Sequence, residues 1–369
     1  MPIPADEYPL HQAPYSLAHA ATSDRNFYDR CYLNCFDTEG DFLLVSGLGQ
    51  YPNLGTTDAF VCVRVGDHQH VVRTSDALGP DRMRQEVGPY RLEIVDPLHE
   101  LHLTCAGDEW GVAVDLHWRG SFPAVDESPH LMRTGAKLTL DAQRFAQVGT
   151  WEGWVRVDGT EYPVVPGRHI GTRDRSWGIR PVGEPEPPGR AAAEPDPGHG
   201  FHWCYVPLRF DDFGLVFIAQ ENGDGHRTLN DALRVWPDGR VDSLGFPRYD
   251  ITYRSGSRIP VAATITAQEP DGTPFVVEIE PRGHVALSAG CGYGPDPQWT
   301  HGVWRGRGFT EGSVYDLHDP ANFIATQFSM LDHLGRATVN GQVGHGLFEH
   351  VCAGRHTPSG FPDAVTMAP

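Results

Sequence analysis

The sequence predicts an all-β protein built from many short antiparallel strands. Glycine (42 residues) and proline (31 residues) are frequent, and they lie between short runs of β-branched and aromatic residues. Such spacing is typical of strands separated by turns. Several runs alternate between apolar and polar residues, which is the period of a strand with one buried face. Helical periodicity is scarce, so strands must supply most of the core.

Strand alternation is clearest in Ala59–Val65, Val112–Trp118 and Thr273–Ile279. We expect each of these segments to form a half-buried antiparallel strand. Hairpin turns are expected at Gly66-Asp67 and at four Asp-Gly pairs, because these residues readily adopt positive φ angles. The four pairs begin at Asp158, Asp224, Asp238 and Asp271.

One segment, Pro320–Phe328, is a candidate for a short helix. Asp319 precedes it as a potential cap, and Pro320 occupies the first helical position, where its missing N–H costs nothing. The segment is short, and a strand is the alternative.

The length of 369 residues exceeds what one hydrophobic core usually supports, which favours two domains. A stretch rich in proline and glycine, residues 185–200, is the best linker candidate. We therefore predict an N-terminal β domain over residues 1–184 and a C-terminal β domain over residues 201–369.

Charge and hydropathy exclude several classes of partner. Asp and Glu (48 residues) outnumber Lys and Arg (29 residues), and a surface this negative repels nucleic acid and anionic lipid. No apolar run approaches the roughly 20 residues that a membrane span needs. We expect a small-molecule ligand, no nucleic acid and no membrane span. A homodimer is compatible with the sequence, which does not define the oligomeric state.

The N-terminal residues Met1–Glu7 contain neither a basic region nor an apolar core, so we predict no signal peptide and a cytoplasmic location. The seven cysteines are an odd number and are scattered, which favours reduced, buried thiols over a disulfide framework.

Neither metal nor cofactor is expected from the motifs present. Cys31 and Cys35 lack a second cysteine pair, and residues three apart on a strand, such as His99 and His102, face opposite ways. His345 and His350 match no known ligand spacing either. The sequence also contains no dinucleotide-binding glycine pattern, no phosphate-binding Gly-Lys-Ser/Thr loop and no Gly-x-Ser-x-Gly elbow.

The densest group of functional side chains lies between Gly171 and Arg180, immediately before the predicted linker. At its centre is Asp174, between Arg173 and Arg175. If Asp174 faces an apolar cavity, desolvation raises its pKa and makes it a general acid, whereas a close arginine lowers the pKa and favours a carboxylate base. In the alternative, Asp174 forms only structural ion pairs with the neighbouring arginines.

The pattern Asp174-x-x-Trp177-Gly178, at the end of one β half and before a second of similar size, resembles the two-domain lipocalin-like superfamily of carotenoid hydratases, AttH-like proteins and related cyclases. The resemblance implies two lipocalin-like antiparallel β-barrel or sheet domains packed side by side. It also implies proton-transfer chemistry on alkenes without a redox cofactor, with Asp174 as the acid and Trp177 lining the cavity.

The flanking residues depart from that pattern. An aromatic residue commonly precedes the aspartate in the superfamily and a histidine commonly follows it, whereas Arg173 and Arg175 stand here. Guanidinium groups bind carboxylate or enolate oxygens, so we assign the two arginines to polarising or anchoring a substrate oxygen. Asp174 would then act as an orienting group or as a base.

Aromatic residues supply the predicted substrate-binding set. Strand alternation places Phe201, Trp203 and Tyr205 on one face, opposite His202. We assign Trp203, Tyr205, Trp177 and Trp154 to the walls of the ligand cavity, where aromatic faces stabilise positive charge.

The predicted function is that of a cofactor-independent lyase, hydratase, isomerase or cyclase acting by proton transfer on a hydrophobic isoprenoid-, steroid- or polyketide-like molecule. The alternative is a non-enzymatic carrier of a hydrophobic small molecule, since both need an apolar cavity. A third option gives the second half a purely structural role and confines the site to the first half or to the groove between the halves.

Overall fold

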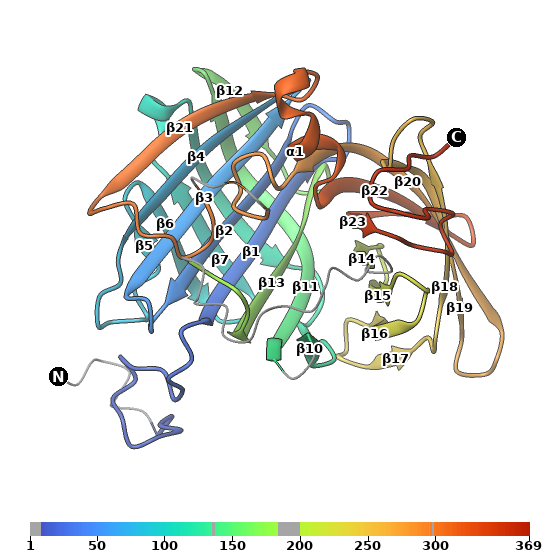
Figure 1. The fold of residues 1–369 in the computed structure, drawn as a ribbon, viewed down its shortest axis with the longest axis horizontal. Helices are drawn as coiled ribbons and strands as arrows, with labels where there is room; N and C mark the ends of the chain where they lie inside the picture. Colours follow the sequence, from blue (N-terminus) through green and yellow to red (C-terminus); the bar gives the residue numbers. More distant parts are fainter. Residues whose placement is uncertain (1–8, 135–136, 184–199, 295, 297–298) are drawn as a thin grey trace.

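The computed structural model describes residues 9–134, 137–183, 200–294, 296 and 299–369. It confirms the all-β prediction: two curled antiparallel sheets lie side by side and correspond to two lipocalin-like units (Figure 1). The predicted linker, residues 185–200, lies outside the described residues except for Gly200, and the domain boundary there stays a prediction.

Among the described residues, the first sheet contains fourteen strands, thirteen of them from the N-terminal half. In chain order the thirteen are β1 (Phe27–Asp37), β2 (Leu43–Tyr51), β3 (Thr56–Val65), β4 (His68–Ala77), β5 (Glu86–Val87), β6 (Tyr90–Asp96), β7 (Glu100–Cys105), β8 (Val112–Gly120), β9 (Val125–Asp126), β10 (His130–Thr134), β11 (Lys137–Val157), β12 (Thr160–Val164) and β13 (His169–Ile179). The order along the sheet is β21-β4-β3-β2-β1-β13-β11-β8-β7-β6-β5, and β9, β10 and β12 also pair with β11.

In the described part of the chain, the second sheet has nine strands in the order β17-β16-β15-β14-β23-β22-β20-β19-β18. They are β14 (Gly200–Arg209), β15 (Gly214–Asn222), β16 (Arg227–Val235), β17 (Val241–Ser243), β18 (Arg248–Tyr253), β19 (Pro260–Gln268), β20 (Pro274–Ala286), β22 (Leu331–Val339) and β23 (Gln342–Gly354).

One strand of the C-terminal half belongs to the first sheet. β21 (Phe309–Asp316) pairs with the edge strand β4 over its whole length, from Phe309 opposite Ser75 to Asp316 opposite His68. It thereby covers an edge of the first sheet, which would otherwise offer unpaired backbone groups to another chain. The two halves of the sequence are therefore interlocked by backbone hydrogen bonds.

The five predicted hairpin turns are confirmed. Asp158-Gly159 joins β11 to β12, and both residues have positive φ, 46° and 80°. Gly66-Asp67 joins β3 to β4, and the remaining Asp-Gly pairs join β15 to β16, β16 to β17 and β19 to β20. The three strands predicted from alternation are also present, as β3, β8 and β20.

The central strands of the first sheet are buried on both faces. Every residue of β2 is buried. Leu44 and Leu48 pack in the core inside the first sheet, whereas Leu43 and Val45 pack in a second core between the two sheets. This double burial explains why Phe42–Val45 is a continuous apolar run rather than an alternating one. A third core fills the inside of the second sheet.

Helix is confined to short segments. The predicted helix near Pro320 is confirmed: a 3₁₀ turn, Pro320–Asn322, is capped by the Asp319 carboxylate, which accepts a hydrogen bond of 2.8 Å from the Ala321 N–H. The α-helix α1 (Phe323–Gln327) follows, and a further 3₁₀ turn spans Asp108–Trp110. Within the described part of the chain, no helix has the length and apolar character to cross a membrane. All seven cysteines are free and buried.

Candidate active site

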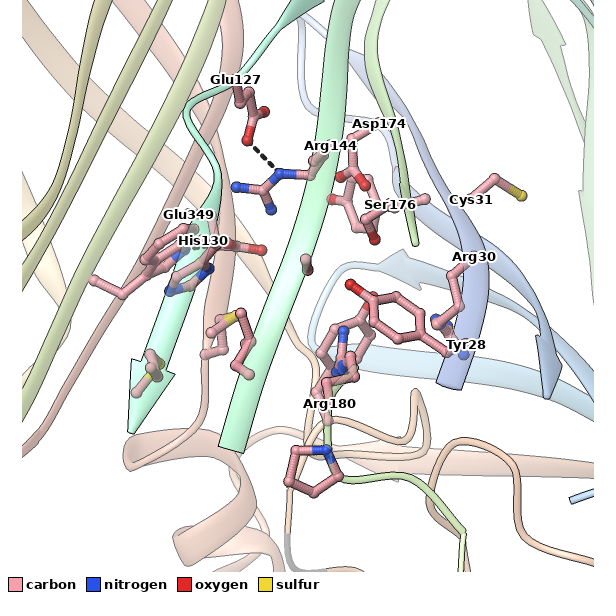
Figure 2. A pocket seen from close by; sticks show the side chains of 18 of the residues that line it. Tyr28, Arg30, Cys31, Glu127, His130, Arg144, Asp174, Ser176, Arg180 and Glu349 are labelled. Carbon is pink, nitrogen blue, oxygen red and sulfur yellow. Dashed lines mark hydrogen bonds and ion pairs between the residues drawn. The ribbon is translucent and has the colours of Figure 1, made fainter. Parts of the chain in front are cut away.

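A cavity of about 320 Å³ lies between the two sheets. Strands β1, β10, β11 and β13 form its wall on the side of the first sheet, and β14 and β23 form the opposite wall. Tyr293 and Met330 reach it from the loops before β21 and β22. Figure 2 shows that charged side chains from several of these strands converge on the same space.

Strand β13 places Asp174 and Ser176 on the cavity wall, since residues two apart on a strand share a face. Tyr32 of β1 lies directly opposite Asp174. Arg30 of β1 and Arg144 of β11 lie opposite Ser176 on its two sides. Directly opposite residues share a face of the sheet, so the carboxyl, the phenol and the two guanidinium groups all meet at the cavity.

Asp174 is half-buried, because part of its surface faces the cavity. Burial raises its pKa to about 6 and Glu349 adds to this effect, against the opposing charges of Arg144, Arg30 and Arg180. Among the described residues, Asp174 forms no ion pair within 4.0 Å. A carboxyl group in this state is partly protonated near neutral pH and can act as a proton donor.

Arg144 forms an ion pair with Glu127, which precedes β10, as Figure 2 shows. Burial raises the pKa of Glu127 to about 7, although the charge of Arg144 opposes this. The guanidinium carbon of Arg144 also lies 5.5 Å from the ring centroid of Trp203 and 4.8 Å from that of Tyr205. Glu127 and two aromatic rings thus hold Arg144 beside the cavity.

Trp203 connects the aromatic and acidic sides of the cavity. Its ring stacks on His130 at 5.6 Å and on Phe201 at 6.4 Å. Its indole N–H donates a hydrogen bond to Glu349 of β23. Burial lowers the pKa of His130 to about 4, so this imidazole is neutral, and Gln220 fixes it through a hydrogen bond of 2.6 Å.

Glu349 forms an acidic pair with Asp332, its cross-strand partner on β22. Burial, followed by the charge of Glu349, raises the pKa of Asp332 well above its usual value. Two carboxyl groups this close hold one proton between them. The Tyr32 hydroxyl donates to Asp332 Oδ2 at 2.5 Å, while Asp332 Oδ1 has no hydrogen-bond partner among the described residues. The strongly raised pKa of Asp332 makes it the protonated member of the pair at neutral pH.

Two further arginines complete the cavity wall. Arg30 forms an ion pair of 3.1 Å with buried Asp58 and lies 5.9 Å from the ring centroid of Tyr293. Arg180 lies 5.8 Å from the same centroid and 5.4 Å from that of Tyr28. The cavity thus combines aromatic walls with three guanidinium groups and with the carboxyl groups of Glu127, Asp174 and Glu349, so its polar groups can bind an oxygen of an otherwise apolar ligand.

The structure separates Asp174 from the arginines beside it in sequence, because neighbouring residues on a strand face opposite ways. Arg173 donates a hydrogen bond of 2.8 Å to Gln147. Arg175 forms an ion pair of 2.9 Å with Asp29. Neither lines the cavity, so the oxygen-binding role predicted for them is open to Arg144, Arg30 and Arg180 instead.

The four aromatic residues predicted to line the cavity lie in different places. Trp203 lines the cavity and Tyr205 lies just behind it, under the guanidinium group of Arg144. Trp177 shares the face of Arg175 and is 37% exposed. Trp154 is half-buried on β11, where it stacks with Arg156 at 4.5 Å, and it does not line the cavity.

No local sequence pattern marks most of the charged cavity residues as part of a site. Arg144, Glu127, Arg30 and Glu349 come from four separate segments, and only the pairing of strands brings them together. The described cavity residues also include neither of the two groups of three potential metal ligands that occur elsewhere in the described structure.

The chain matches one family of known sequences over nearly its whole length. A family model described as "Family of unknown function (DUF8625)" matches residues 3–362, nearly the entire chain. The chain belongs to this family. No curated protein matches this DUF8625 chain.

Three solved structures share the fold of this DUF8625 protein. An AttH-like protein from Nitrosomonas europaea has a TM-score of 0.53 and 12% identity, over 90% of this chain and 94% of that one. Kievitone hydratase from Nectria haematococca has a TM-score of 0.51 and 14% identity, over 91% and 92%. CghA with Sch210972 has a TM-score of 0.50 and 11% identity, over 89% and 88%. These similarities confirm the predicted lipocalin-like architecture, and at such identities they establish the fold alone.

Proposed function

We propose that this protein is a cofactor-independent lyase, hydratase, isomerase or cyclase that transfers a proton to a hydrophobic small molecule. The observation that carries the proposal is the position of Asp174, a carboxyl group at the cavity with a pKa of about 6 and no ion pair among the described residues. General acids work best when their pKa lies near the working pH.

The arginines narrow the substrate class. Arg144, Arg30 and Arg180 surround the space in front of Asp174, and guanidinium groups stabilise negative charge that develops on oxygen. A hydrophobic molecule whose double bond is conjugated to a carbonyl group fits this arrangement, since its enolate oxygen would receive such stabilisation. The aromatic walls formed by Phe201, Trp203 and Tyr293 suit an isoprenoid-, steroid- or polyketide-like skeleton.

In the proposed hydration, water adds to the β-carbon of the conjugated double bond and the π electrons move onto the carbonyl oxygen, which an arginine stabilises. Asp174 then gives its proton to the α-carbon and becomes a carboxylate. The proton lost by the added water passes to Glu349, and exchange with solvent restores both carboxyl groups. In an isomerisation, no water adds, and the same two groups take and return a proton.

The test uses deuterium. The protein is incubated in D2O with a panel of isoprenoid alkenes and hydrophobic conjugated carbonyl compounds, and mass spectrometry detects new carbon–deuterium bonds. Asp174→Asn should still bind the reactive compound but should incorporate deuterium about 10²- to 10⁴-fold more slowly, the usual contribution of a general acid. Asp29→Asn is the matched control, because Asp29 pairs with Arg175 on the opposite face of the sheet.

Deuterium incorporation at an unchanged rate in Asp174→Asn would remove Asp174 from the mechanism. Tight binding of a panel compound by the native protein, with no deuterium incorporated and no product formed, would favour the carrier function instead.

A further inference from the structure

Three potential metal ligands meet on the outer face of the first sheet, away from the cavity. They are His102 of β7 and Asp115 and His117 of β8. Along both strands these residues alternate with Leu101, Leu103, Leu116 and Trp118, which are buried in the core of the first sheet. The alternation therefore directs the three polar side chains outward.

Strand pairing brings the ligand atoms together. His102 lies directly opposite His117, and their rings stack with centroids 4.0 Å apart and an interplanar angle of 9°. His102 Nε2 lies 2.7 Å from Asp115 Oδ1, and His117 Nε2 lies 3.8 Å from the same oxygen. Two imidazole nitrogens thus converge on one carboxylate oxygen.

We propose that His102, His117 and Asp115 form a surface binding site for Zn²⁺. Zinc binds imidazole nitrogen and carboxylate oxygen at about 2.0–2.2 Å, so two ligand atoms at a tetrahedral angle lie roughly 3.4 Å apart. The two distances to Asp115 Oδ1, 2.7 and 3.8 Å, lie on either side of this spacing. Because the stacked rings direct their nitrogen lone pairs nearly parallel, at least one imidazole must rotate for both to bind one ion, and the fourth position is left to water.

The surroundings favour a cation. Glu93, which forms an ion pair of 3.0 Å with Arg91, lies opposite His102 on β6, and Glu152 lies opposite His117 on β11, so carboxylates flank the two histidines in one row across the sheet. The ligand side chains are 26%, 41% and 52% exposed for His102, Asp115 and His117, which lets an ion enter without unfolding.

A second group, His202, Glu221 and His356, has similar ligand types but a different charge environment. Arg227 donates to Glu221 at 2.7 Å, so the carboxylate is already neutralised, and a cation bound there would lie beside a buried guanidinium group. This contrast favours the outer site and supplies an internal comparison for the experiment.

The test measures Zn²⁺ binding to the full-length protein by competition with a chromogenic chelator. We expect one zinc site per chain. Loss of a residue that only supports a metal ligand lowers metal affinity roughly 10- to 100-fold. His117→Ala and His102→Ala each remove a ligand itself, so each should lower the zinc affinity by more than that. His226→Ala, which changes an exposed histidine in the turn between β15 and β16, is the matched control. Because the variants change only surface residues, circular dichroism should show a native fold.

A second readout locates the ion. Trp154 lies opposite Asp115 on β11, so Cu²⁺ bound at the proposed site should quench its fluorescence. The quenched component should disappear in Trp154→Phe and in the double variant His102→Ala/His117→Ala. Unchanged zinc affinity in that folded double variant would overturn the proposal, as would zinc binding that is lost only in His356→Ala.

Discussion

Asp174 and Tyr32 are cross-strand partners at the junction of β13 and β1, and both side chains line the cavity between the two sheets. Tyr32 donates its hydroxyl hydrogen to Asp332, which in turn pairs with Glu349 at the opposite wall. The arrangement leaves Asp174 without a hydrogen-bonding partner from this acidic pair, although all of these groups surround one cavity.

Turnover should depend on pH as expected for an essential acid. The pKa of Asp174 is raised to about 6, so the protonated form declines above that pH. The rate of proton transfer should fall about tenfold for each pH unit above this value. The measurement is kcat/KM against pH with any substrate found in the deuterium screen. A rate that rises from pH 6 to pH 8 would assign Asp174 a basic role instead.

The ionisation of Asp174 should also change the free energy of unfolding. The folded-state pKa of Asp174 lies above its ordinary value of 3.8, so its contribution to stability is present at low pH and is lost as the pH rises through about 6. Asp174→Asn should therefore be more stable than the native protein at pH 8, by about 1 kcal/mol after allowance for solvation from the cavity. The difference should shrink at pH 4. Thermal unfolding at the two pH values measures it, and a less stable variant at pH 8 would contradict the raised pKa.

The ion pair between Arg144 and Glu127 should be strongly coupled. Arg144→Met removes the partner of the buried Glu127 carboxyl, which then takes up a proton, and the lost hydrogen bond should cost about 1–3 kcal/mol of stability. The double variant Arg144→Met/Glu127→Gln should recover part of this loss. Arg156→Met is the matched control on the same strand, because its two ion pairs are exposed and should cost less than about 1 kcal/mol. Equal losses in Arg144→Met and Arg156→Met, measured by denaturant unfolding, would contradict the prediction.

Trp203 should stabilise the protein in two separable ways. Trp203→Phe keeps an aromatic ring but removes the N–H that donates to Glu349, which should cost about 1.5–3 kcal/mol. Trp203→Leu also removes the stacking on His130 and Phe201, at a further cost of roughly 1–3 kcal/mol. In a Glu349→Gln background the first loss should become smaller. A loss of the same size in that background would show that the hydrogen bond is not its cause.

The fold was predictable because its signals are local. Alternating segments and Asp-Gly turns specify strands and hairpins directly, and the Pro320 helix carries its cap next to it in sequence. The pairing of β21 with β4 carries no such signal, since the strands are more than two hundred residues apart and only the folded sheet presents the open edge.

The candidate site was predictable only in part, because strand pairing rather than a local sequence pattern brings many of its residues together. Asp174 and Trp203 stand out within their own strands. Strand alternation, applied to residues 173–177, would also have placed Arg173, Arg175 and Trp177 on the face opposite Asp174. The arginines that do line the cavity come from distant strands and look like ordinary surface charges in sequence. The same holds for His102 and His117, whose proximity arises from cross-strand pairing rather than from spacing along one strand.

The protonation of Asp174 can be measured without knowing the substrate. Carbon-13 NMR of protein labelled at the aspartate carboxyl carbon, with the Asp174 signal assigned by its absence in Asp174→Asn, gives the pKa directly. The expected midpoint is about 6. A midpoint at or below the ordinary value of 3.8 would show that Asp174 is a charge-paired carboxylate, and it would contradict the proposed role as proton donor.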